Sequence, residues 1–132
     1  LKTLHQFFCE KIKLYFSRLA SNKDENPVVF QIKEYLHQNY AVPSLSVPDI
    51  SEHVRLSPTY VCTLFKNETG QTLNQYLTDY RIKMSKQFLS DPLYKITDIS
   101  AKVGYSDGNY YSKAFRKIVG LSPSEYREKM LR

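Results

Sequence analysis

The sequence predicts an all-α fold in which two helix-turn-helix units are joined by one long helix. The first observation behind this prediction is an internal repeat, because Asp49-Ile50-Ser51 recurs 49 positions later as Asp98-Ile99-Ser100, and corresponding Val, Ser, Phe, Gly and Tyr residues follow in both copies. The second observation is that each copy carries two apolar stripes at helical spacing with a short turn between them. Two short helices around a tight turn form a helix-turn-helix, so the chain is expected to contain two.

The first unit is expected at about residues 46–70. Ile50 and Val54 supply the apolar stripe of its first helix, and the chain then turns at Arg55-Leu56. Ser57-Pro58 has the composition of an N-cap followed by a first helical residue. The second helix is expected to bury Val61, Leu64 and Phe65 and to end at Gly70.

The second unit, at about residues 96–120, follows the same pattern. Thr97 is the expected N-cap of a helix with Ile99 and Val103 on its apolar face. Gly104 falls where a chain leaving a helix often needs a positive φ. The second helix is expected to have Ser106 or Asp107 as its N-cap, to bury Tyr111, Ala114, Phe115 and Val119, and to end at Gly120.

Further helices are expected outside the two units. A linking helix at about residues 72–90 joins them, and a final helix at about 123–131 follows Ser122-Pro123, so that residues 27–132 form one domain. Residues 1–26 carry an amphipathic stripe formed by Leu4, Phe8, Ile12, Tyr15 and Leu19. This helix could pack on the domain, pair with its copy in a homodimer, or connect to an upstream domain, which is the role we expect. The chain begins with Leu, which indicates a fragment.

Basic residues outnumber acidic ones by 19 to 13, which gives a net charge of +6 and a pI near 9.3. This balance favours polyanionic partners, but the excess is modest, so the placement of the charges matters more than their number. Polar and basic side chains lie on one face of the second helix of each unit, at Thr59, Cys62, Thr63 and Lys66, and at Asn109, Ser112, Lys113 and Arg116. Such side chains suit base edges and phosphates in a DNA major groove; the alternative is an ordinary solvated helix face.

The sequence contains no pattern typical of an enzyme active site, a cofactor site or a metal site. Cys9 and Cys62 form no CxxC or Cys-His spacing, and His5, His37 and His53 are isolated. A Gly-rich phosphate loop, a pair of carboxylates and a nucleophile motif are equally lacking. Without a signal peptide or an apolar run of about 18 residues, the chain is expected in the cytoplasm with no membrane contact.

Specific runs of residues connect both units to a known family. They are Ile99–Asp107, Tyr110–Lys117 and Gly120–Arg127 in the second unit, and Leu56–Val61, Leu64–Lys66, Glu68–Gly70 and Tyr80–Ile82 in and after the first. These runs resemble the signature of the AraC/XylS family of bacterial transcription regulators, over about residues 28–130. The resemblance implies a seven-helix DNA-binding domain that places two recognition helices in successive major grooves.

The resemblance also implies which residues contact DNA. Base contacts would come from Thr59, Cys62, Thr63, Gly108, Asn109, Ser112 and Lys113, and phosphate contacts from Lys66, Arg116 and Lys117. Asn109 and Lys113 are the best candidates for direct readout, because an amide can pair with adenine and a Lys can reach guanine. Gly108 has no side chain, so we expect this position to contribute no base recognition. The recognition helix of the first unit lacks a long Arg or Gln, so we expect its half-site to be read loosely.

Some positions depart from the usual family pattern or have a structural role. Ser51 and Ser100 stand where many relatives carry Ala, and each hydroxyl is expected to bond back to a helical carbonyl. Tyr80-Arg81 and Tyr126-Arg127 occupy equivalent places, and the resemblance implies that both pairs brace the bundle, with the ring inward and the Arg stem over apolar surface. Most of the eleven tyrosines are expected in the core.

The expected function is sequence-specific binding of double-stranded promoter DNA by a bacterial transcription regulator. By resemblance, the protein would be an activator that recruits RNA polymerase and that responds through an upstream sensor or receiver domain. A non-specific nucleic-acid packaging module and a helical protein-interaction module are the alternatives. The duplicated, capped second helices argue against both.

Overall fold

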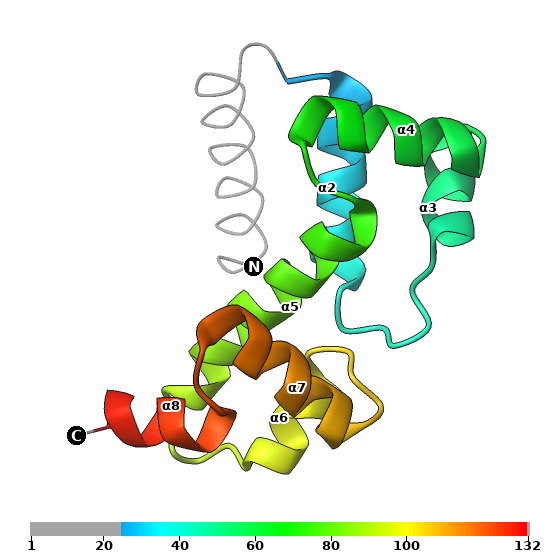
Figure 1. Ribbon diagram of the computed structural model, residues 1–132. Coiled ribbons are helices and arrows are strands. Elements are labelled where there is room, and N and C mark those ends of the chain that lie inside the picture. The colour runs from blue at the N-terminus through cyan, green and yellow to red at the C-terminus, as the bar shows by residue number, and fades with distance from the viewer. Residues whose placement is uncertain (1–24, 132) are drawn as a thin grey trace, which may run out of the picture.

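A computed structural model describes residues 25–131 of the chain (Figure 1). In this range the secondary structure is entirely helical, which confirms the all-α prediction: α2 (Pro27–Asn39), α3 (Val47–Val54), α4 (Pro58–Thr69), α5 (Leu73–Leu89), α6 (Ile96–Lys102), α7 (Gly108–Val119) and α8 (Pro123–Met130). The amphipathic stripe expected between Leu4 and Leu19 lies outside the described residues. None of the described helices is long and apolar enough to cross a membrane.

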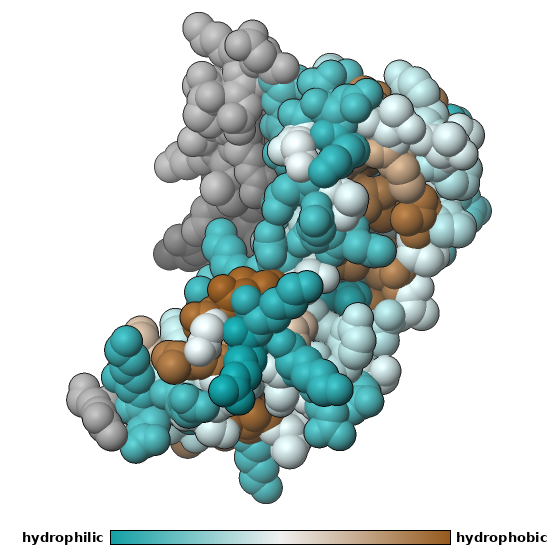
Figure 2. All heavy atoms as spheres, in the orientation of Figure 1, coloured by the Kyte–Doolittle hydropathy of each residue, from teal (hydrophilic) through white to brown (hydrophobic). Residues whose placement is uncertain are grey.

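The helices form two units that share α5. α2, α3 and α4 pack around a first core that contains Ile32, Leu36 and Phe65, whereas α6, α7 and α8 pack against a second core that contains Ile99 and Phe115. Figure 1 shows α5 running from one unit into the other. Most of the face seen in Figure 2 is hydrophilic, with hydrophobic patches near α3 and α4 and near the end of α7.

α5 connects the two cores through its own side chains. Leu73 and Leu77, in its first half, are buried in the first core, and Ile82 and Leu89 are buried in the second. Its N-terminus is fixed by a capping box in which the Thr72 hydroxyl accepts from the backbone N–H of Gln75 and the Gln75 side chain accepts from that of Thr72. Because one uninterrupted helix contributes to both cores, the two units cannot fold independently of it.

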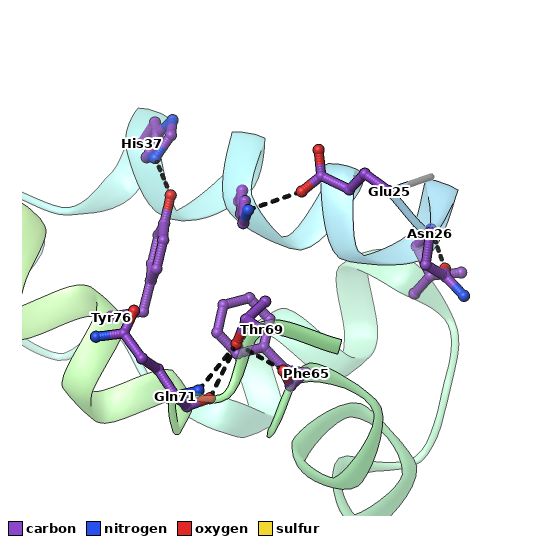
Figure 3. A network of polar contacts seen from close by, with 9 residues as sticks. Glu25, Asn26, His37, Phe65, Thr69, Gln71 and Tyr76 are labelled. Carbon is purple, nitrogen blue, oxygen red and sulfur yellow. Dashed lines mark hydrogen bonds and ion pairs between the residues drawn. The ribbon is translucent and has the colours of Figure 1, made fainter. Parts of the chain in front are cut away.

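The first unit is tied to the start of α5 by polar and aromatic contacts (Figure 3). His37 on α2 and the hydroxyl of Tyr76 on α5 form a hydrogen bond of 2.8 Å. The Tyr76 ring also meets Phe65 of α4 edge to face, with 5.4 Å between ring centroids. At the end of α4, the Thr69 hydroxyl donates to the Phe65 carbonyl over 2.7 Å. These contacts fix the C-terminal end of α4 against α2 and α5.

The ends of the helices agree with the sequence prediction except at α6. Ser57 caps α4, and Asp107, one of the two predicted candidates, caps α7. The prediction of Thr97 as the cap of α6 is wrong, because α6 begins at Ile96 and Lys95 occupies its N-cap without a side-chain cap bond. The half-buried Ile96 packs against the second core. Because of this packing, α6 begins before the residue at which capping preference alone would start it.

The two small serines use their hydroxyls in different ways. The Ser100 hydroxyl donates to the Thr97 carbonyl in the preceding helical turn over 2.9 Å, as predicted. The prediction is wrong for Ser51, whose hydroxyl donates forward to the Leu56 carbonyl over 2.6 Å. Arg55 adopts a left-handed conformation with a φ of 59°, and the Leu56 backbone N–H donates to the Ser51 carbonyl, so the chain folds back over the end of α3.

Candidate nucleic-acid interface

The second helices of the two units, α4 and α7, have the same internal register. Each begins one residue after its N-cap, and the buried residues Val61 and Tyr111 follow that cap at the same distance. Phe65 and Phe115 are buried one turn later in the same way. The polar positions predicted to contact DNA therefore lie on equivalent faces of the two helices.

All the predicted contact residues are accessible. The exposed ones are Thr59, Cys62, Thr63 and Lys66 on α4, and Gly108, Asn109, Lys113, Arg116 and Lys117 on α7, whereas Ser112 is half-buried. Cys62 is a free thiol. The structure thus brings each predicted set together on one helix.

The N-termini of α4 and α7 offer additional polar groups. The Ser57 hydroxyl accepts from the backbone N–H of Tyr60 over 3.2 Å, and the Asp107 carboxylate accepts from that of Asn109 over 2.9 Å. Other first-turn N–H groups have no partner within the helix and, with the helix dipole, favour an anion. At Gly108, a Cβ would meet nothing closer than the Ser100 hydroxyl at 3.9 Å, so the backbone is open to an incoming group.

A hollow lies beside the N-terminus of α7. It has a volume of about 300 Å³ and is lined by Thr97 and Ser100 of α6 and by Asn109 and Ser112 of α7, among others. Hydroxyl and amide groups from both helices of the second unit therefore line one hollow at the N-terminus of α7.

Positive charge is concentrated on α7. This helix carries Lys113, Arg116 and Lys117 and no acidic residue, whereas α4 carries Lys66 and Glu68. The Lys66 ammonium group also donates to the Gly70 carbonyl over 3.1 Å, at the end of its own helix. Electrostatic attraction for a polyanion is therefore stronger at α7 than at α4.

Sequence comparisons place this geometry in a known family. Residues 50–129 match the family described as "Helix-turn-helix domain". Over 110 residues, which are 83% of this chain, the sequence is 36% identical to the Msm operon regulatory protein of Streptococcus mutans. The chain belongs to the AraC-type family of transcription regulators. This family consists of DNA-binding regulators and not of enzymes.

Other AraC-type proteins support the same assignment. The raffinose operon transcriptional regulatory protein RafR of Pediococcus pentosaceus is 30% identical over 126 residues, or 95% of this chain. The solved C-terminal domain of AraT, a response regulator from Geobacillus stearothermophilus, superposes on this chain with a TM-score of 0.76 at 29% sequence identity. The superposition covers 79% of this chain and 86% of the AraT domain. The present chain spans 39% of the Msm regulator and 45% of RafR.

Two exposed residues of this AraC-type domain were not among those predicted from the sequence. Tyr60 on α4 and Tyr110 on α7 are 53% and 66% exposed, although the tyrosines were expected mostly in the core. They occupy equivalent positions, each directly before the buried Val61 or Tyr111. Tyr110 also lines a groove of about 730 Å³ between α7 and the first half of α5, together with Lys113. The signal that could have found them is their position next to a core residue in both copies of the repeat.

Proposed function

We propose that this AraC-type domain reads two DNA motifs in successive major grooves, with α4 in one groove and α7 in the next. The observation that carries the proposal is the equal register of α4 and α7, which presents two equivalent polar faces on one chain. The shared helix α5 supports it, because 17 residues extend over roughly 26 Å at 1.5 Å per residue. Together with the bundles on either side, this length suits reading heads about one DNA turn, or roughly 34 Å, apart.

Base recognition would be strongest at α7. Asn109 can pair with adenine and Lys113 with guanine, with Ser112 and the Gly108 backbone beside them. On α4, Thr59, Cys62 and Thr63 are short, so their contacts would be fewer or mediated by water.

Phosphate binding would come mainly from the basic residues near the end of α7. Arg116 and Lys117 are exposed there, and Lys66 would contribute from α4 after exchanging its bond to Gly70 for one to a phosphate. Such contacts set the affinity and its salt dependence but add little sequence preference. The exposed phenols of Tyr60 and Tyr110 add two hydrogen-bond donors beside the same faces.

At the level of the whole protein, we propose a cytoplasmic transcription activator that recruits RNA polymerase. The curated relatives are more than twice as long as this chain, which supports an additional sensor or receiver domain. The N-terminal stripe would connect to that domain or pair two copies in a homodimer.

Selection of bound duplexes from a random pool tests the reading function. The expected winner contains two short motifs about ten base pairs apart, of which the one read by α4 is vaguer, and binds about a thousandfold more tightly than a scrambled duplex. The measurement is a titration of both duplexes at two salt concentrations. Equal affinities that fall steeply with salt would instead indicate a packaging module, and binding to neither duplex would indicate a protein-interaction module.

A further inference from the structure

One Arg on the shared helix lies where the two units meet. The Arg81 guanidinium donates through Nε to the Tyr40 carbonyl over 2.8 Å and through Nη2 to the Val42 carbonyl over 2.9 Å. Tyr40 is the C-cap of α2, so both bonds satisfy carbonyls at and beyond the negative end of that helix. This half of the arrangement belongs to the first unit.

The other side of Arg81 contacts the turn between α6 and α7. The Tyr105 ring lies over the guanidinium, with 5.4 Å from the guanidinium carbon to the ring centroid. Gly104 is packed so closely that a Cβ would collide with the Tyr40 carbonyl oxygen and would lie 2.8 Å from Arg81 Nε. The helix-turn-helix turn of the second unit therefore rests on the first unit's α2–α3 loop, with Arg81 between them.

Aromatic packing connects the same place to both cores. Tyr40 packs against the first core and also against the second. Its ring meets Tyr80 edge to face, with 5.2 Å between centroids. Arg81 is half-buried, so its hydrogen bonds are partly shielded from water.

The internal repeat supplies a natural comparison. Arg127 on α8 donates through Nε to the Leu89 carbonyl over 3.0 Å and through Nη2 to the Asp91 carbonyl over 3.1 Å, which reproduces the capping pattern of Arg81 at the end of α5. Both partners of Arg127 belong to α5 and the loop that follows it, within the second unit. Capping an earlier helix is therefore common to both residues, whereas joining the two units is specific to Arg81.

We propose that Arg81, held between the Tyr40–Val42 loop and the Gly104–Tyr105 turn, fixes the relative orientation of the two units and so sets the half-site spacing that one chain can read. The second part of this inference rests on the proposed two-groove function. One added base pair moves a half-site by about 3.4 Å and rotates it by about 35°, so a rigid joint should reject it. Arg81 is a positioning residue and need not touch DNA.

The orientation is tested first without DNA, by measuring the distance between two spin labels. One label is attached to the native Cys62 on α4 and the other to Lys117→Cys on α7, in a chain that also carries Cys9→Ser. We expect the chain with Arg81 to give a narrow distance distribution. Arg81→Gln should broaden it about twofold, because the small interface between the loop and the turn then no longer holds the two units in one orientation. The matched control, Arg127→Gln, should leave the width unchanged, and melting curves show that both variants are folded at the measuring temperature. An unchanged width in Arg81→Gln, or equal broadening in both variants, would overturn the proposal.

The consequence for DNA is tested by titrating duplexes in which the selected motifs are separated by the optimal spacer or by one base pair more or less. We expect Arg81→Gln to lose about tenfold in affinity at the optimal spacer, because the effective concentration of the second head falls, and to discriminate less between spacers. Arg127→Gln should keep the spacing optimum. If the unsubstituted chain shows no optimum, the two-groove function fails, while the spin-label result still decides whether Arg81 orients the units.

Discussion

Arg55 and Gly104 occupy equivalent positions in the turns of the two units, yet only one of them is glycine. Both residues have positive φ, 59° and 95°. Gly104 is required because a Cβ would collide with the Tyr40 carbonyl, whereas Arg55 is exposed. A left-handed Arg costs about 1–2 kcal/mol, and glycine loses about 0.5–1 kcal/mol of this through its more flexible unfolded chain. We therefore expect Arg55→Gly to raise the free energy of unfolding by about 0.5–1 kcal/mol, as measured by urea denaturation.

Two matched variants check the reason for this gain. Arg55→Gln removes the charge but keeps a side chain at positive φ, so it should not stabilise the protein. Gly104→Ala should destabilise it, because strain and collision act together there. A gain from Arg55→Gln equal to that from Arg55→Gly would show that charge, and not backbone strain, is the cause.

Asn109 is the residue whose substitution should change sequence preference most clearly. Its side chain is exposed in the first turn of α7, beside the hollow between α6 and α7. Asn109→Ala is expected to cost about 1–3 kcal/mol at the selected site and to relax one base position, measured by titrating single-base variants of the duplex. Gln87→Ala, which removes an exposed amide from α5, serves as the control. Equal losses on all sequences would mean that Asn109 does not read a base.

Among the elements, α7 depends on a single side chain for its N-cap bond. The Asp107 carboxylate accepts the Asn109 N–H, and the helix places its candidate contacts directly after this cap. Asp107→Ala should lower the free energy of unfolding by about 1 kcal/mol, whereas Asp107→Ser retains a capping oxygen and should lose less. Chemical denaturation of the three proteins measures the difference. Equal stability of the Ala and Ser variants would show that the cap does not stabilise α7.

The elements that sequence predicts well are those with a local cause. Ser57, Asp107 and Gly120 mark helix ends through bonds or dihedral angles within a few residues, so their roles could be predicted. The start of α6 could not, because packing of Ile96 against the second core overrides the capping preference of Thr97. The exposure of Tyr60 and Tyr110 was missed for a related reason, since composition alone does not give the helix face on which a residue lies.

For the whole molecule, the contacts that join the two units were the least predictable. The repeat predicted two similar units, and the family resemblance suggested that Arg81 and Arg127 both brace the bundle with their stems over apolar surface. The structure shows in addition that each guanidinium bonds to carbonyls of an earlier segment, and Arg81 lies 41 residues from Tyr40. No periodicity in sequence reports a contact over such a separation. The asymmetry between the units therefore appears only when both are folded against α5.

Burial of tyrosines throughout the second core predicts how stability changes at high pH. Burial raises the pKa of Tyr105 and of Tyr111 above the ordinary value of 10.0, although the charge of Arg81 partly opposes this at Tyr105. In the unfolded chain these phenols ionise near pH 10, while the folded protein still holds their protons. The part of the free energy of unfolding that comes from keeping these phenols protonated is therefore fully present below about pH 10, and it is lost as the pH rises through the folded-state pKa values.

Tyr111→Phe isolates one of these groups. Because Phe does not ionise, the variant should lose less stability than the unsubstituted protein between about pH 9 and pH 11, whatever its stability at neutral pH. Urea denaturation at a series of pH values measures both slopes, and lysine titration cancels in the comparison because both proteins share the same lysines. Parallel slopes would mean that the Tyr111 hydroxyl ionises equally readily in the folded and unfolded chains, which contradicts its burial at 1% exposure beside Phe115.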